Sequence, residues 1–368
     1  MNDLFIFGTL LDGDLRRVVA GCDLAGHPAV LNGQGVWRAS RGDYPVLGAG
    51  DGAAGLLLCD VPSEALARLH FYEEGFGYVT DSVTVCVDGA MRPATVYVPA
   101  NPAAPSGDEW SLADWQAGWG AMTRRAAQEA MALFGTTTGE GLRQRMGTIR
   151  VRAASSLRAE TREVAGEPFG RSAVTTIAAR RPYVNFFAVE EQELSHRRFD
   201  GTQSGVMTRA GFLMGDAVTV LPYDPVRDRV LLVEQFRYGI YLRGDPAPWS
   251  LEPVAGRIDP GEDPETAVRR EAQEEAGLEM GRLHHVANHY PSPAAVTEFL
   301  FSYVGLCDLP GLTPGAGGLD SEHEDIRTHV MAFDDLMARI GQGVITNTPL
   351  LLTAYWLLNE RSRPGAFA

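Results

Sequence analysis

The alternation of apolar and polar residues predicts strands in the first hundred residues and a helix after them. Short apolar runs bounded by Gly, Pro and Asp are typical of strands. Such runs occupy residues 4–7, 55–61, 81–88 and 94–99. A proline-rich break follows at 99–106, and apolar residues then recur at helical spacing over 110–134. This part of the chain is therefore predicted to mix strands and helices.

A second strand-rich region begins near Val174. It includes residues 217–236, where two apolar runs flank the turn Asp224-Pro225. The stretch between the two regions is rich in Arg, Gly, Ser and Thr, which favours a solvated linker over a phosphate-binding arginine patch. A chain of 368 residues is long enough for two domains. We therefore predict an α+β protein with one domain at 1–134, a linker at 135–175 and a second domain at 176–368.

Composition narrows the possible chemistry. The net charge of −15 argues against a general nucleic-acid partner, because such proteins usually present a basic face. All 32 basic residues are arginine, so neither a P-loop lysine nor a lysine Schiff base is possible. A phosphate group would have to be bound by arginine, backbone amides or a metal ion. A bound divalent cation would supply the positive charge that an acidic chain lacks.

The cysteines and the apolar runs indicate where the protein works. The cysteines are widely spaced and form no CxxC pair, so neither a zinc knuckle nor a disulfide framework is predicted. The opening MNDLFIFGTL lacks the basic start and long apolar stretch of a signal peptide. The apolar run at 349–358 is too short to span a bilayer. We expect a cytoplasmic protein without a membrane partner.

One motif carries most of the chemical information. Residues 256–278, GRIDPGEDPETAVRREAQEEAGL, fit the spacing of a glycine, five residues, a glutamate, seven residues and then R-E-U-x-E-E-x-G-U. The glycine is Gly256, the first glutamate is Glu262, and the second block begins at Arg270. Every position is filled, although Ala272 is small where the pattern calls for an aliphatic residue.

Capping residues in the motif predict a helix whose surface is acidic. Asp263 is suited to the N-cap, Pro264 to the first helical position and Gly277 to the residue after the last turn. The carboxylates Glu271, Glu274 and Glu275 stand at i, i+3 and i+4 and so share one face. Crowded carboxylates repel one another unless cations compensate, and oxygen ligands suit Mg²⁺. The alternative is a solvated acidic face. Arg270 is expected to orient Glu262 or Glu271 rather than to bind substrate.

The motif is the Nudix signature, and residues from about 177 to 360 resemble the ADP-ribose pyrophosphatases of the Nudix family. The resemblance rests on residues 221–237, 248–256, 290–298 and 321–330, and on Pro293, which stands where that family has a proline typical of ADP-ribose specificity. It implies an α/β/α sandwich with a mixed sheet. It also implies hydrolysis of a nucleotide sugar, ADP-ribose, to AMP and ribose 5-phosphate with Mg²⁺ or Mn²⁺. The family forms homodimers by exchanging its first strands.

The resemblance also implies roles for individual residues. The metal ligands would be the carbonyl of Ala255 with Glu271, Glu274 and Glu275. The catalytic base would be Glu322 or Glu324, in an acidic loop. Substrate would be bound by Arg237 and Glu252 near the ribose-pyrophosphate, by Ser292 and Glu298 in YPSPAAVTE, and by Arg209 and Phe186 beside the adenine, with Phe186 serving the partner subunit. The chain departs from the family at Ala294 and Ala295, where glycines are usual, and at Arg257, where Met is usual.

The first 120 residues resemble the γ-glutamylcyclotransferase (AIG2-like) family, which implies a small β-barrel-like fold. The resemblance rests on FIFGTL (5–10), DYPVL (43–47), Gly55 and LHFYEEGFGYVTDSVTV (69–85). It implies that the loop of Gly8, Thr9 and Leu10 binds a carboxylate through its amides and that Glu73, with Glu74 beside it, is the acid/base. Phe7 replaces a tyrosine and His70 an aspartate. The alternatives are an ordinary exposed helix-end carboxylate for Glu73 and a structural role for His70.

Three functional hypotheses follow. The first is an ADP-ribose hydrolase with an accessory domain. The second is a nucleotide-sensing module that does not cleave, although such modules tend to lose the motif glutamates that this chain keeps. The third makes cyclotransfer in the first domain the main activity, against which Phe7 argues. The pair of domains also resembles tellurite-resistance proteins of the TrgB type, which names a phenotype and no reaction.

Overall fold

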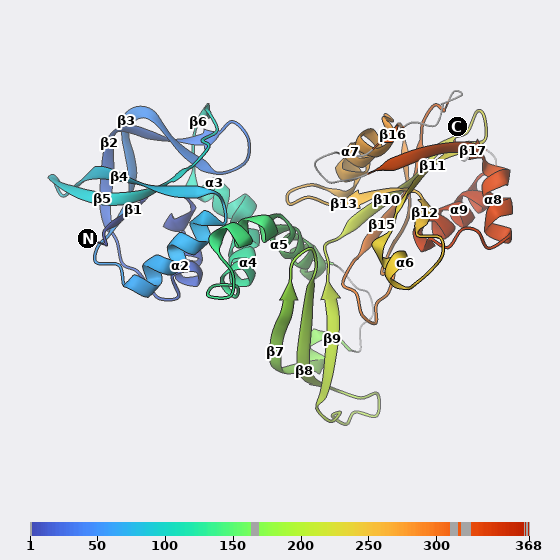
Figure 1. Ribbon diagram of the computed structural model, residues 1–368, viewed down its shortest axis with the longest axis horizontal. Helices are drawn as coiled ribbons and strands as arrows, with labels where there is room; N and C mark the ends of the chain where they lie inside the picture. Colours follow the sequence, from blue (N-terminus) through green and yellow to red (C-terminus); the bar gives the residue numbers. More distant parts are fainter. Residues whose placement is uncertain are drawn as a thin grey trace. The chain divides into compact units, whose positions relative to one another are not determined.

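The computed structural model describes residues 2–162, 169–309, 316–317, 325–363, 365 and 367. The chain divides into two compact units (Figure 1). The first unit comprises Met1–Arg162 together with Val184–Phe186, and the second comprises Glu163–Tyr183 and Phe187–Ala368.

The first unit contains a closed barrel. Its strands are β1 (Leu4–Ile6), β2 (His27–Ala39), β3 (Pro45–Leu58), β4 (Tyr78–Val87) and β5 (Ala90–Pro99), with β6 (Pro105–Glu109) added at β2. The hydrogen-bonded order is β3-β1-β5-β4-β2, and a further pairing of β2 with β3 closes the ring. Buried side chains such as Phe5, Leu57, Val85 and Val96 form one of its cores. The predicted barrel is confirmed.

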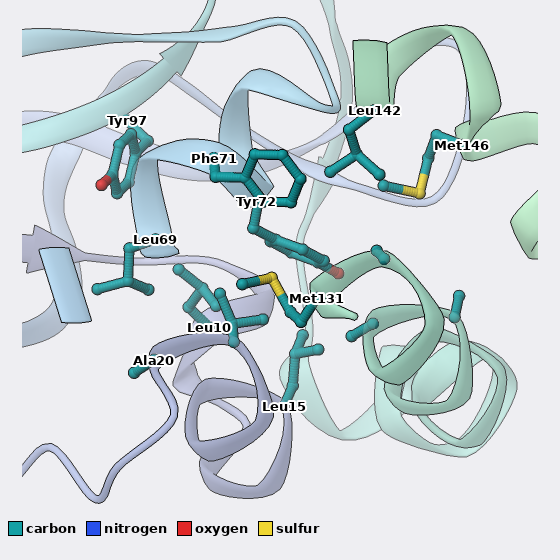
Figure 2. Close-up of a cluster of buried hydrophobic side chains, with 14 of the residues drawn as sticks. Leu10, Leu15, Ala20, Leu69, Phe71, Tyr72, Tyr97, Met131, Leu142 and Met146 are labelled. Atoms are coloured by element: carbon teal, nitrogen blue, oxygen red, sulfur yellow. The ribbon is translucent and has the colours of Figure 1, made fainter. Parts of the chain in front are cut away.

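Helices pack together to form the second core of the first unit. They are α1 (Gly13–Ala20), α2 (Ser63–Glu74), α3 (Leu112–Trp115), α4 (Ala121–Met131) and α5 (Gly139–Glu160), with a short π-helical turn at Gln116–Gly120. Figure 2 shows Phe71 and Tyr72 of α2 in this cluster beside Leu142 and Met146 of α5. The predicted helix at 110–134 is therefore α3, the π-helical turn and α4.

Helix α5 corrects the predicted linker at 135–175. Leu142, Met146, Ile149 and Ala153 recur at helical spacing and are buried in the first unit. Mostly polar residues, arginine above all, fill the positions between them, which lowers the average hydrophobicity of the segment and hides its apolar face. Helix α5, residues 139–160, is thus part of the first unit's core, whereas residues after Arg162 are grouped with the second unit.

The second unit is built around a mixed eight-stranded sheet. Its strands are β10 (Ala217–Asp224), β11 (Arg229–Phe236), β12 (Trp249–Glu252), β13 (Val254–Arg257), β14 (Leu283–His289), β15 (Leu300–Leu306), β16 (Ala316–Gly317) and β17 (Ile326–Ala332). Strands β10 and β15 run parallel, and the predicted pair at 217–236 is the antiparallel pair β10–β11 around the Asp224 turn. A separate three-stranded sheet consists of β7 (Val174–Val184), β8 (Ala188–His196) and β9 (Met207–Leu213).

Helices cover both faces of the eight-stranded sheet, as Figure 1 shows. On one face α7 (Pro264–Ala276) packs on Val218 and Val220 of β10. On the other, α8 (Phe333–Gly341) and α9 (Thr348–Glu360) pack on Leu221 and Tyr223 of the same strand. Alternate residues of β10 therefore face opposite cores, as expected of a strand buried on both sides. The predicted α/β/α sandwich is confirmed. In the described part of the chain, no helix is both long and apolar enough to cross a membrane.

Candidate functional site

Helix α7 carries the acidic motif in the predicted form. The Asp263 carboxylate accepts hydrogen bonds from the amides of Glu265 and Thr266, Pro264 occupies the first turn, and Gly277 ends the helix at φ 64°. A residue in this left-handed region is usually glycine, because a Cβ would be strained there. The capping residues are confirmed. Ala272, the small residue in the motif, is fully buried under the sheet.

Arg270 forms hydrogen bonds with three carboxylates of the motif. Its guanidinium donates to Glu262 at 3.0 Å, to Glu271 at 2.7 Å and to Glu274 at 3.0 Å. It also donates to the carbonyl of Arg257 at 2.9 Å. These carboxylates raise the pKa of Arg270 through the Glu262 hydrogen bonds first, so the side chain stays charged. Arg270 thus contacts both Glu262 and Glu271, the two residues that it was predicted to orient.

Two of the predicted metal ligands reach the backbone of β13. The carboxyl carbon of Glu271 lies 1.9 Å from where a Cβ on Gly256 would stand, so only a glycine leaves it this position. The Glu275 carboxylate, which is 2% exposed, accepts a hydrogen bond from the Ala255 amide at 3.2 Å. Glu271, Glu275 and Ala255 are therefore neighbours, and this oxygen-rich set fits a divalent cation. Among the described residues, however, no three His, Cys, Asp or Glu side chains form a preassembled metal cluster.

Three of the residues predicted to bind the substrate, Arg237, Glu252 and Glu298, are grouped near the ends of β11 and β12. Arg237 makes a two-pronged ion pair with the buried Glu252, with a closest distance of 2.6 Å. Burial raises the pKa of Glu298, while the charges of Arg257 and Arg237 oppose that rise. Glu298 therefore lies within electrostatic reach of Arg237. The Ser292 carbonyl accepts hydrogen bonds from the amides of Ala295 and Val296, which forms the turn after Pro293.

The remaining predicted residues are not brought into this group. Arg209 lies on β9 and is exposed, and its guanidinium donates to the carbonyl of Thr208. Phe186 follows β7, is 62% exposed and is grouped with the first unit. Glu322 and Glu324 lie outside the described residues.

The first unit holds a cavity of about 440 Å³, and the residues predicted from its sequence lie around it. Gly8, Thr9 and Leu10 form part of its lining, and Glu73 is another part. Glu73 is only 8% exposed, so the interpretation as an exposed helix-end carboxylate is wrong. Burial raises its pKa to about 8. His70 accepts or donates a hydrogen bond at 2.9 Å with the hydroxyl of Tyr97, in agreement with a structural role.

Sequence reasoning missed several residues of this cavity. Tyr72, Tyr78 and Tyr97 line it. Burial raises the pKa of each, and the charge of Glu73 raises it further. Arg143 and Arg150 of α5 line it as well. Their spacing of seven residues on one helix face was the available signal, but it lay in the segment assigned to a linker.

Comparison with known proteins identifies both units. Residues 214–350 match the NUDIX domain model. An ADP-ribose pyrophosphatase of Escherichia coli (strain K12) is 39% identical over 189 residues, which cover 51% of this chain and 90% of that protein. The chain belongs to the Nudix family. Residues 4–117 of this Nudix hydrolase match the model described as Gamma-glutamyl cyclotransferase, AIG2-like.

Other relatives of this Nudix hydrolase differ in the substrate that they are named for. An ADP-ribose pyrophosphatase of Haemophilus influenzae is 34% identical over 191 residues, covering 51% of this chain and 88% of that protein. A GDP-mannose pyrophosphatase of Cronobacter sakazakii is 32% identical over 138 residues, covering 38% and 71%. A crystal structure of an ADP compounds hydrolase covers 53% of this chain and 98% of its own at 20% identity and a TM-score of 0.38, too distant a likeness for comparing sites.

Proposed function

We propose that this Nudix hydrolase cleaves the pyrophosphate bond of ADP-ribose with Mg²⁺, giving AMP and ribose 5-phosphate. The observation that carries the proposal is the placement of Glu271 and Glu275 against the backbone of Gly256 and Ala255. The relatives named ADP-ribose pyrophosphatase support the choice of substrate, because they match over a longer part of the chain than the GDP-mannose pyrophosphatase does. Mn²⁺ is the alternative cation.

The residues of α7 would hold the metal ion, and neighbouring residues would hold the substrate. Glu271, Glu275 and the Ala255 carbonyl would be ligands, with Glu274 completing the set. A divalent cation bound there neutralises charge on the pyrophosphate oxygens and lowers the pKa of bound water. Arg237 and Glu252 would position the ribose-pyrophosphate. A water molecule then attacks phosphorus, the bridging P–O bond breaks, and a carboxylate takes the water's proton; we propose Glu322 or Glu324 for that role.

The experiment is an assay of AMP release from ADP-ribose by the full chain. We expect turnover with Mg²⁺ or Mn²⁺, and its loss in EDTA that added Mg²⁺ reverses. GDP-mannose serves as the competing substrate and should be cleaved more slowly. Undiminished turnover in EDTA would refute the metal-dependent mechanism. Faster cleavage of GDP-mannose would refute the choice of substrate while leaving the mechanism standing.

We also propose that the hydrolase is a homodimer through β7 and the strands beside it. β7 is exposed along almost its whole length, yet it carries Val174 and Ile177, which are 45% and 54% exposed. Exposed apolar residues on a strand commonly mark a surface for association. Ile177→Arg should shift the protein from dimer to monomer in sedimentation equilibrium, whereas Val226→Arg, at an exposed turn, should not. A wild type that sediments as an active monomer would contradict the dimer.

A second candidate function belongs to the first unit. Its cavity places a buried carboxyl, Glu73, in the same lining as the loop Gly8–Leu10. A protonated carboxyl with a raised pKa suits proton transfer within a γ-glutamyl group, which would release 5-oxoproline. Release of 5-oxoproline from γ-glutamyl substrates, lost in Glu73→Gln, is the corresponding test.

A further inference from the structure

Helix α5 brings two arginines to the cavity of the first unit. Arg143 and Arg150 both line it, and they stand seven residues apart, two turns along one face of the helix. At 1.5 Å per residue their backbones are roughly 10 Å apart, so the two guanidinium groups together can reach a group the size of a carboxylate or a phosphate. The match to the cyclotransferase family ends at residue 117, so both arginines come from outside the matched region.

The charges around the cavity favour an anion. Its other charged lining residues are Asp43 and Glu73. Asp43 already pairs with Arg38 at 3.1 Å and accepts a hydrogen bond from the Trp119 indole at 2.7 Å. Glu73 is mostly protonated near neutral pH, because burial raises its pKa. Arg143 and Arg150 are the basic residues of this lining.

Both arginines have surroundings that fit a binding role. The Arg150 guanidinium lies 5.9 Å from the ring centroid of Trp119. Burial raises the pKa of Tyr72, the charge of Glu73 raises it further, and the positive charge of Arg150 lowers it. Arg150 thus lies near the same tyrosine as the buried carboxyl. Arg143 has Glu140 at 3.9 Å, a distant contact on the solvent side of the helix with little stabilising value.

We propose that Arg143 and Arg150 bind the acidic group of a small ligand whose other end lies beside Glu73. Arginine forks match carboxylate and phosphate groups equally in geometry, so the shared chemistry is a small anion with a polar body. The helices after the family-matched region thereby select for ligands that end in a negative charge. This inference concerns binding in the first unit and does not depend on hydrolysis in the second.

The test is isothermal titration of the full chain with a matched pair of probes. γ-Glutamylglycine ends in a carboxylate, and γ-glutamyl ethylamide has a neutral end of similar length. Inorganic phosphate is titrated alongside to distinguish a carboxylate from a phosphate ligand. We expect at least one of the two anions to bind the wild type about tenfold or more tightly than it binds Arg143→Gln/Arg150→Gln. The neutral probe should be affected little, and Arg17→Gln, an exposed arginine of the same unit, should behave as the wild type.

Each outcome of the titrations either supports the proposal or overturns it. The proposal is overturned if both anions bind the wild type and the double variant equally, or if neither binds. It is also overturned if the neutral probe loses as much affinity as the anions, because that would indicate a distorted cavity. If the double variant unfolds at a lower temperature than the wild type, the salt dependence of binding to the wild type is the test. Added NaCl should weaken the binding of the anions and leave the binding of the neutral probe unchanged. Equal salt dependence of the probes would contradict the proposal.

Discussion

Glu275 of α7 and Glu73 of α2 are two buried carboxyl groups in comparable positions with opposite surroundings. Each lies in the last turn of its helix, where the helix dipole disfavours a negative charge, and they are 2% and 8% exposed. The Glu275 carboxylate accepts a hydrogen bond from the Ala255 amide. Arg270 donates hydrogen bonds to the neighbouring carboxylates of Glu262, Glu271 and Glu274. For Glu73, burial in the first unit raises the pKa of the carboxyl.

The comparison teaches that burial does not decide what a carboxyl group can do. Around α7 a backbone amide and the Arg270 guanidinium donate hydrogen bonds to the carboxylates, an arrangement that suits the binding of a metal ion and a pyrophosphate. A carboxyl without such neighbours keeps its proton to higher pH, which suits proton transfer.

The largest effect is expected from Glu275→Gln. The amide retains the size of the side chain and can still accept from Ala255, but it loses the charge that a metal ion needs. Turnover of ADP-ribose should fall by roughly 100-fold or more. Glu279→Gln, an exposed residue just after the helix, is the matched control and should keep full activity. A rate near that of the wild type in Glu275→Gln, with an unchanged melting curve, would show that Glu275 is not a ligand.

Gly256→Ala should cause the next largest loss. The new Cβ would overlap the Glu271 carboxyl, and this flexible side chain can move aside at little cost in stability. The carboxylate would then leave its place beside β13, so we expect turnover to drop by about 10- to 100-fold while the melting temperature changes little. Gly205→Ala, where a Cβ meets nothing within 4 Å, is the control. A large loss of stability with normal turnover in the folded fraction would contradict this account.

The sequence predicted the acidic site better than the cavity because its information is local. Asp263, Pro264 and Gly277 are caps within one helix, and the spacing of Glu271 and Glu275 alone predicts a shared face. Arg237 and Glu252 were named only through the family resemblance, and their pairing was not predicted, since one follows β11 and the other ends β12. Spacing gives no hint of which strands meet, because the pairing is decided by the whole sheet.

The cavity of the first unit depends on contacts between distant segments. Glu73 is buried because α2 packs against α4 and α5, and the sequence around it could not distinguish this from an exposed helix end. β2 was missed because HPAVLNGQGVWRA mixes glycine, asparagine and exposed positions, and a bulge lies between Asn32 and Gln34. Helix α5 was missed because its buried face consists partly of alanines.

Glu73→Gln should change how the stability of the first unit depends on pH. In the folded protein the pKa of Glu73 is about 8, against 4.5 for an unperturbed glutamate. The stabilising contribution of the neutral carboxyl is fully present below pH 4.5. It declines as the pH rises, because only the unfolded chain ionises there, and it stops declining above pH 8. Glu73→Gln has no carboxyl to ionise, so its free energy of unfolding does not fall for this reason. Between pH 4.5 and pH 8 the variant should therefore gain a few kcal/mol of stability relative to the wild type.

Hydrogen exchange of peptides from α2, measured from pH 5 to pH 9 and corrected for the intrinsic rate, would detect this difference in the full chain. Glu74→Gln is the matched control, because Glu74 is the adjacent residue and is exposed. Parallel pH profiles for the wild type and Glu73→Gln would mean that Glu73 is ionised in the folded protein, which would contradict the raised pKa.

The smallest effect is expected from Phe7→Tyr. Phe7 lines the cavity, is 6% exposed and stacks on Phe5 at 6.3 Å between ring centroids, so a tyrosine ring fits the same position. The added hydroxyl restores the group that the cyclotransferase resemblance calls for. One orienting hydrogen bond contributes about 0.5–1.5 kcal/mol, so 5-oxoproline release should rise by no more than about tenfold. Glu73→Gln, assayed in parallel, should abolish that release in both backgrounds. If Phe7→Tyr brings no gain while Glu73→Gln still abolishes the activity, the missing hydroxyl does not limit this unit, and the tyrosines already around Glu73 do the orienting.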